Sequence, residues 1–130
     1  MRQWTSILAG TAITTFLALG ATACGSADSN VAGGDGDPAA RGKEIAIANG
    51  CAACHGTDGQ GGVGPGFVGL AGSTVELEDG TTMVADTEYL RRSIVDPAAE
   101  IRPGWSVNMP QRTFEPGEVD AIIEFIQSLG

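Results

Sequence analysis

One five-residue stretch, Cys51-Ala52-Ala53-Cys54-His55, constrains this chain more than any other feature. A Cys-x-x-Cys pair alone is typical of a redox dithiol or of half a zinc site, whereas a His directly after the second Cys is typical of covalent attachment of a c-type haem. Two intervening residues let both thiols reach one edge of a porphyrin, and the next side chain then turns under the ring. The motif therefore predicts one covalent haem c, with Cys51 and Cys54 as thioether donors and His55 as an axial iron ligand.

The two alternatives for this motif fit the chain less well. A structural zinc site takes four ligands, usually Cys or His, and no second Cys or His pair lies near the motif. A thioredoxin-like dithiol comes with strands that alternate with helices. The flanks here are instead a short helical stretch and a run of glycines.

The first 23 residues have the pattern of an export signal. Arg2 precedes a mostly apolar stretch over residues 7–19, which is too short to span a bilayer comfortably as a permanent helix. Ala21-Thr22-Ala23 is a small-residue cleavage pattern, and Cys24 follows it directly. Cys24 has no partner once haem takes the other two cysteines, and the stretch resembles a bacterial lipobox. We expect a signal peptide over residues 1–23 and lipidation of Cys24, the alternative being ordinary cleavage that leaves a free thiol.

The charge balance limits the partners. Sixteen acidic residues against seven basic ones give a formal net charge of −9, which argues against binding to nucleic acid. Lys43 is the only lysine, so docking through a ring of lysines is not expected. Net charge favours a basic or neutral partner, or one held close by a shared membrane.

The remaining pattern predicts a single small domain over residues 38–130, after a flexible tether over residues 24–37 that carries almost no apolar bulk. Pro38 suits the first turn of a helix over residues 39–49, whose thin apolar side consists of Ile45 and Ile47 with Ala46 and Ala48. The other expected elements are a glycine-rich loop over 56–72, a hairpin with strands 74–77 and 81–84, a helix capped by Asp86 or Thr87 that runs to about residue 95, and a closing helix over 116–129.

The sixth iron ligand has several candidates. His55 is the only histidine, so the ligand is a Met, Lys43, a small molecule or nothing. Met83 falls in an expected strand, whereas Met109 lies in an irregular Pro- and Gly-bearing segment that can bring a thioether across the haem, and we predict Met109. Pro65 is the candidate carbonyl for the Nδ1–H of His55. Trp105 and Arg102 either bind the haem propionates or simply pack and face solvent.

Residues 38–130 resemble the class I, mitochondrial-like cytochromes c of bacteria. The resemblance rests on the Cys51 motif, on Gly64-Pro65 followed by Gly69-Leu70, on Met109-Pro110 and on Phe125 in the closing helix. Residues 74–110 are especially similar to the haem c domain of subunit II of some haem–copper oxidases. The resemblance implies a mostly α fold of three to four helices around one haem, with a small hairpin insertion, Cys51 and Cys54 on the porphyrin, His55 and Met109 on iron, and Pro65 orienting His55.

Two positions depart from the family pattern. Ala46 stands where the family often has an aromatic residue that packs against the last helix, although Gly42 could still permit a close crossing. Phe67 replaces the more frequent Leu in the loop that faces the haem, which is a change of shape.

The expected function is one-electron transfer by a membrane-tethered monohaem carrier rather than an enzyme. It would act in a respiratory chain on the outer, periplasmic face of a bacterial membrane, between a quinol-oxidising complex and a terminal oxidase. The alternatives are a fixed haem relay subunit of an oxidoreductase complex and a ligand-binding haem sensor or peroxidase.

Overall fold

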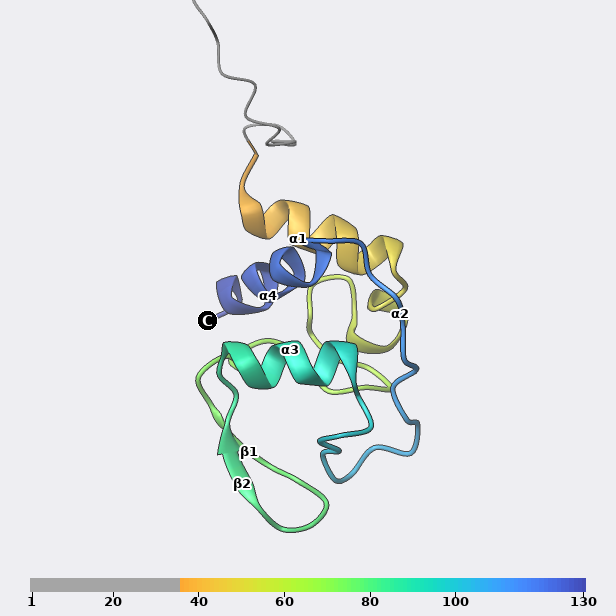
Figure 1. The fold of residues 1–130 in the computed structure, drawn as a ribbon, viewed down its shortest axis with the longest axis vertical. Coiled ribbons are helices and arrows are strands. Elements are labelled where there is room, and N and C mark those ends of the chain that lie inside the picture. The colour runs from red at the N-terminus through yellow and green to blue at the C-terminus, as the bar shows by residue number, and fades with distance from the viewer. Residues whose placement is uncertain (1–35) are drawn as a thin grey trace, which may run out of the picture. The chain divides into compact units, whose positions relative to one another are not determined.

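The structure is a computed structural model that describes residues 36–130. These residues form four helices and one two-stranded antiparallel sheet, as Figure 1 shows. In chain order the elements are α1 (Pro38–Ala48), α2 (Ala52–His55), β1 (Thr74–Glu76), β2 (Thr82–Val84), α3 (Thr87–Val95) and α4 (Glu118–Ser128). The mostly helical composition and the small hairpin agree with the sequence prediction. The expected signal peptide, Cys24 and nearly all of the expected tether lie outside the described residues.

Helix α1 spans Pro38–Ala48, one residue earlier at each end than the predicted range of 39–49. Asp37 caps it by accepting a hydrogen bond from the backbone N–H of Ala39 at 3.0 Å, and Pro38 occupies the first turn. The packing face agrees with the prediction in part. Ala46 is buried together with Gly42, and Ile45 packs partly buried against the core, whereas Ile47, which we also expected on the packing side, is 45% exposed. The two buried positions of α1 therefore carry small residues.

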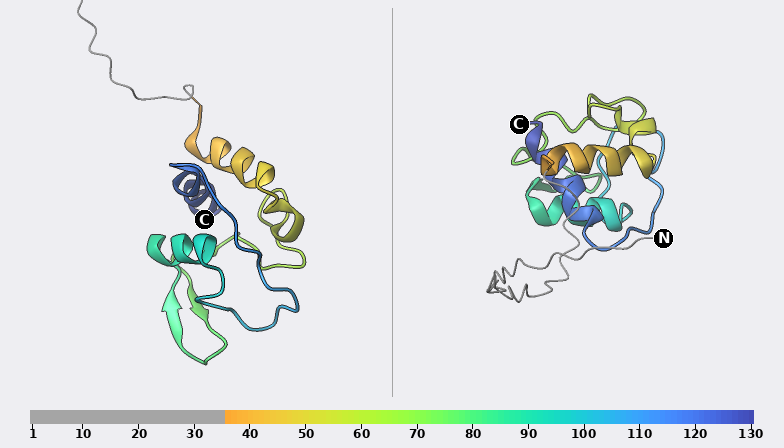
Figure 2. Two further views of the ribbon diagram at one scale, coloured as in Figure 1. Left: turned by 45° about the vertical axis from the view of Figure 1, so that its right-hand side comes forward. Right: turned by 90° about the horizontal axis from the view of Figure 1, so that it is seen from above.

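Helix α4 lies against α1 in the views of Figures 1 and 2. Its buried side carries the largest share of the core, namely Val119, Ile122, Ile123, Phe125 and Ile126. It is shorter at the start than the prediction of residues 116–129, because Gly117 has a φ of +83° and turns the chain before Glu118. At the crossing, a Cβ added to Gly42 would lie 1.8 Å from the carbonyl oxygen of Ala121. The two helices approach closely because α1 has no side chain at that point.

Helix α3 and the hairpin form the other side of the core. Asp86 is the cap, because its carboxylate accepts a hydrogen bond from the N–H of Tyr89 at 2.8 Å. Tyr89, Leu90 and Ile94 are buried as the predicted apolar stripe. Strands β1 and β2 pair in the register Val75↔Met83, each one residue shorter than predicted.

Two long segments without helix or strand, residues 56–73 and 96–117, connect these elements. Among the described residues, no helix has the length and apolar character needed to cross a membrane.

Candidate cofactor site

The Cys51 motif folds into a single helical turn. Cys51 precedes α2 with helical dihedral angles, and the N–H groups of Cys54 and His55 both bond to the Cys51 carbonyl, at 3.2 and 3.0 Å. Residues three and four apart in a helix lie on one face, so this turn aligns Cys51 with Cys54 and places His55 beside them. Both thiols are free and partly accessible, whereas His55 is only 7% exposed.

His55 is oriented by a backbone carbonyl. Its Nδ1 lies 2.7 Å from the carbonyl oxygen of Pro65, in the contact that the sequence analysis expects. A carbonyl can only accept, so Nδ1 carries the proton and Nε2 keeps a free lone pair. Gly64 permits this approach, because a Cβ there would lie only 3.2 Å from Cε1 of His55. The N–H of Gly64 bonds to the carbonyl of Cys54 at 3.0 Å, which ties the loop to the motif.

Phe67 makes the second contact that holds the His55 imidazole. Its ring stacks on His55 with centroids 4.5 Å apart and an interplanar angle of 21°. The same ring meets Phe125 of α4 edge to face, at 6.4 Å and 89°. Phe67 therefore links the imidazole to the closing helix, a role that sequence reasoning missed when it treated the residue only as a change of shape.

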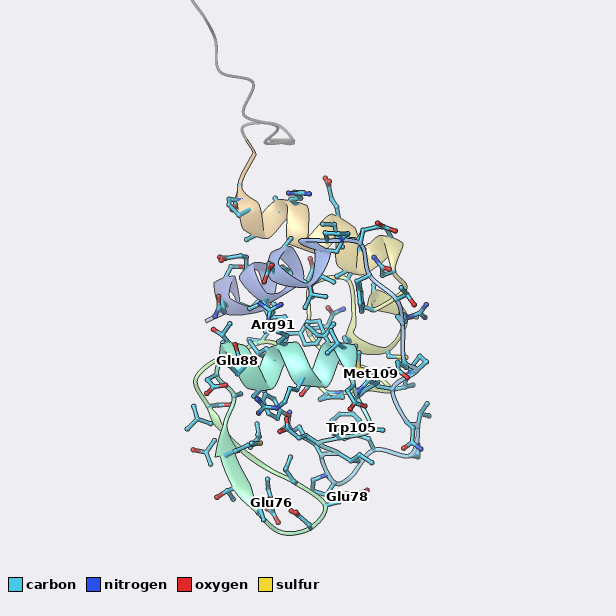
Figure 3. All side chains as sticks on the ribbon, viewed as in Figure 1. Glu76, Glu78, Glu88, Arg91, Trp105 and Met109 are labelled. Atoms are coloured by element: carbon cyan, nitrogen blue, oxygen red, sulfur yellow. The ribbon has the colours of Figure 1, made fainter. Side chains whose placement is uncertain are left out.

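A cavity of about 200 Å³ opens beside the imidazole. Its apolar walls come from the loop, α3 and α4, and include Leu70, Tyr89, Leu90, Ile94, Ile122 and Ile126. Cys51 and His55 line it from the motif, and Met109 and Trp105 line it from the 96–117 segment. Figure 3 places Met109 near the C-terminal end of α3, with Trp105 close by. A second cavity, of about 120 Å³, also has Cys51, Cys54, His55 and Met109 on its walls.

The candidates for the sixth iron ligand lie in different parts of the fold. Met109 lines both cavities together with His55, whereas neither Met83 nor Lys43 lines either one. Met83 packs against the core from β2, and Lys43 forms an ion pair with Asp58. Arg102, like Trp105, lines the larger cavity. Of the described candidates, Met109 is the one that lines the same cavities as His55.

Two buried polar atoms on the cavity wall have no protein partner within the described part of the chain. They are the hydroxyl oxygen of Ser93 and Oε2 of Glu100, whose other oxygen accepts a hydrogen bond from Nε of Arg92 at 2.9 Å. Leaving a buried polar group unpaired costs about 1–3 kcal/mol. The Ser93 hydroxyl can therefore donate a hydrogen bond to a polar substituent of a largely apolar bound group such as haem. The carboxylate oxygen of Glu100 needs a donor instead, which the carboxylates of haem do not supply. Sequence reasoning gave no signal for either residue.

The pKa of the Cys51 thiol lies above its ordinary value. Burial raises this pKa, and the weaker attraction of the Arg112 guanidinium lowers it. Across residues 36–130, no group of three or more His, Cys, Asp or Glu side chains is placed to bind a metal ion by itself.

An oriented buried His, two thiols on one helical turn and an apolar cavity shared with a Met define a protein that binds haem covalently. The chain belongs to the cytochrome c family, because the family model described as "Cytochrome c" matches residues 39–130. A search of curated proteins found no match. Family membership makes the cofactor covalent haem c, with the motif cysteines at the expected attachment position, and makes haem-based electron transfer the general activity, exercised with redox partners.

Proposed function

We propose that the chain is a class I monohaem cytochrome c in which His55 and Met109 bind iron and Cys51 and Cys54 bind the porphyrin. The observation that carries this proposal is that His55 and Met109 line the same two cavities, with Cys51 on the walls of both and Cys54 on the wall of the smaller one. Bound haem c supplies a one-electron change between ferric and ferrous iron.

The protein residues set the conditions for that change. The Pro65 carbonyl fixes the tautomer and direction of the His55 ring and raises its basicity as a ligand. A neutral Met thioether and an apolar surround both favour the reduced state, which raises the reduction potential relative to two His ligands. Ser93 and Arg102, which line the larger cavity, would donate hydrogen bonds to the propionate carboxylates.

The proposed cellular role extends to residues outside the described range. Export through residues 1–23 and acylation of Cys24 would tether the domain to the outer face of a bacterial membrane. There it would pass single electrons from a quinol-oxidising complex to a terminal oxidase. The net charge of −9 and the single lysine suit a partner concentrated by the shared membrane rather than one captured by a lysine ring.

Redox titration and carbon monoxide binding test the electron-transfer assignment. The protein, coexpressed with a cytochrome c maturation system, should show one reversible one-electron wave and should not bind carbon monoxide at neutral pH without denaturant. Rapid binding of carbon monoxide by the native protein would instead indicate an open iron position and a sensor or peroxidase function.

Cell fractionation tests the tether separately. Wild-type protein should sediment with membranes and incorporate labelled fatty acid, whereas Cys24→Ala should be exported in soluble form with its haem intact. A wild-type protein that is soluble and unlabelled would contradict lipidation and leave the haem assignment unaffected.

A further inference from the structure

The edge of the cofactor site has an apolar and nearly uncharged surface. Val63 and Val107, from segments far apart in the sequence, are 57% and 55% exposed, and both line the smaller cavity beside the motif. No acidic residue lines that cavity, although the chain as a whole carries sixteen. Two exposed aliphatic side chains that meet beside the haem-attachment motif are more consistent with a docking surface than with isolated surface positions.

A single cation marks this edge. Arg112 is the only Lys, Arg, Asp or Glu among the residues that line the smaller cavity. Its guanidinium lies beside Gly50, where an added Cβ would be 3.2 Å from Nη2. The ion pairs within residues 36–130 are Lys43–Asp58, Arg91–Asp120 and Arg92–Glu100, so no described carboxylate neutralises Arg112.

The acidic charge is concentrated elsewhere. The hairpin and the start of α3 expose Glu76, Glu78, Asp79, Asp86 and Glu88, and residues 66–90 contain no Lys or Arg. In Figure 3, Glu88 lies at the opposite end of α3 from Met109, and Glu76 and Glu78 lie on the hairpin. The described domain therefore has an acidic end and an apolar, weakly positive edge.

We infer that the redox partner presents an apolar patch bordered by a carboxylate that faces Arg112, and that Val63 and Val107 pack on that patch. This inference rests on the proposed function. Net charge alone favours a basic partner, but a basic surface would attract the hairpin end and hold the cofactor edge away from the partner. Local charge governs the orientation of docking, because exposed charges beyond about 10 Å are largely screened at moderate salt.

Voltammetry on chemically defined monolayers tests the inference. The probes are gold electrodes coated either with mixed methyl- and carboxylate-terminated chains or with amine-terminated chains, and the protein is the full-length holoprotein carrying Cys24→Ala to remove the acyl group. We expect faster electron exchange on the methyl–carboxylate surface. Arg112→Glu should slow exchange on that surface about fivefold or more, in line with the effect of charge at a docking edge.

Arg41→Glu is the matched control, because it makes the same change in net charge at an exposed position of α1. About nine residues of mostly helical rise separate Arg41 from Gly50, or roughly 13 Å, so this variant should stay within about twofold of the parent rate. Faster exchange on the amine surface, or equal slowing by the two variants, would overturn the inference. Loss of a reversible signal on every surface would count against the proposed function itself.

Discussion

His55 is held by two contacts from the loop that follows it. The Pro65 carbonyl accepts the Nδ1 proton, and the Phe67 ring stacks on the imidazole while it also meets Phe125. The first contact can be predicted from sequence, because a carbonyl beside a Gly-Pro step near the motif is free to approach. The second cannot, because stacking depends on how the loop packs against α4, which lies about sixty residues further along the chain.

Truncation of Phe67 tests this contact. Phe67→Ala should destabilise the holoprotein by about 3–5 kcal/mol through the cavity it leaves, whereas Phe67→Leu should cost only about 1 kcal/mol because it keeps most of the volume. Denaturant unfolding, followed by the haem spectrum and by far-ultraviolet circular dichroism, measures both. Equal stability of Phe67→Ala and wild type would contradict the packing described here.

The Lys43–Asp58 pair predicts a small pH effect. Lys43 donates a hydrogen bond to the Asp58 carboxylate and attracts its charge, so the pKa of Asp58 lies below its ordinary value. A depressed folded-state pKa contributes stability above the unfolded-state pKa of about 3.9, and this contribution is lost as the pH falls through the folded-state pKa.

Lys43→Met should therefore flatten the acid side of the stability profile. Urea midpoints measured between about pH 6 and pH 3 should fall less in the variant than in wild type, and about 1 M salt should remove most of the difference because both groups are exposed. Parallel profiles for the two proteins would show that the pair contributes nothing.

At the scale of elements, the helices could be predicted, whereas the packing of α1 could be predicted only in part. Apolar periodicity gives α3 and α4 with nearly correct bounds, and Asp86 and Gly117 fix their starts. In α1 the predicted apolar side includes Ala46, which is buried, but also Ile47, which is exposed. Hydrophobic periodicity does not detect a contact at a position without a side chain. The sequence indicates only that Gly42 could permit a close crossing, and the structure shows that crossing with α4.

The sign of the stability change caused by Gly42→Ala tests the close crossing of α1 and α4. In an ordinary helix this change is stabilising by about 1 kcal/mol. Here a Cβ would lie 1.8 Å from the Ala121 carbonyl oxygen, so α1 and α4 must separate and stability should fall by about 2–3 kcal/mol or more. Arg41→Ala, at the exposed neighbouring position, should stay within about 0.5 kcal/mol of wild type. Thermal unfolding of both variants distinguishes the two signs, and a stabilised Gly42→Ala would contradict the crossing.

At the scale of the whole molecule, the cofactor could be predicted and the charge distribution could not. Five consecutive residues give the attachment chemistry, because the spacing itself sets which atoms can reach the porphyrin. Placement of Met109 needs the course of the irregular 96–117 segment. The sequence excludes only a second His as the sixth ligand, and Met83 and Lys43 are separated from His55 by the structure. The apolar edge around Arg112 arises from three segments that meet in space, so a net charge of −9 gives no indication of it.

The far-red absorption band that arises from a bond between haem iron and a methionine sulfur, recorded on the oxidised protein, tests whether His55 and Met109 bind the same iron. Wild type and Met83→Ala should both show the band, because Met83 packs against the core from β2 and lines neither cavity. Met109→Ala should lose the band and gain carbon monoxide binding while its covalent haem remains attached. A wild-type protein without the band, or a Met109→Ala variant that keeps it, would contradict the assignment and with it the account of electron transfer.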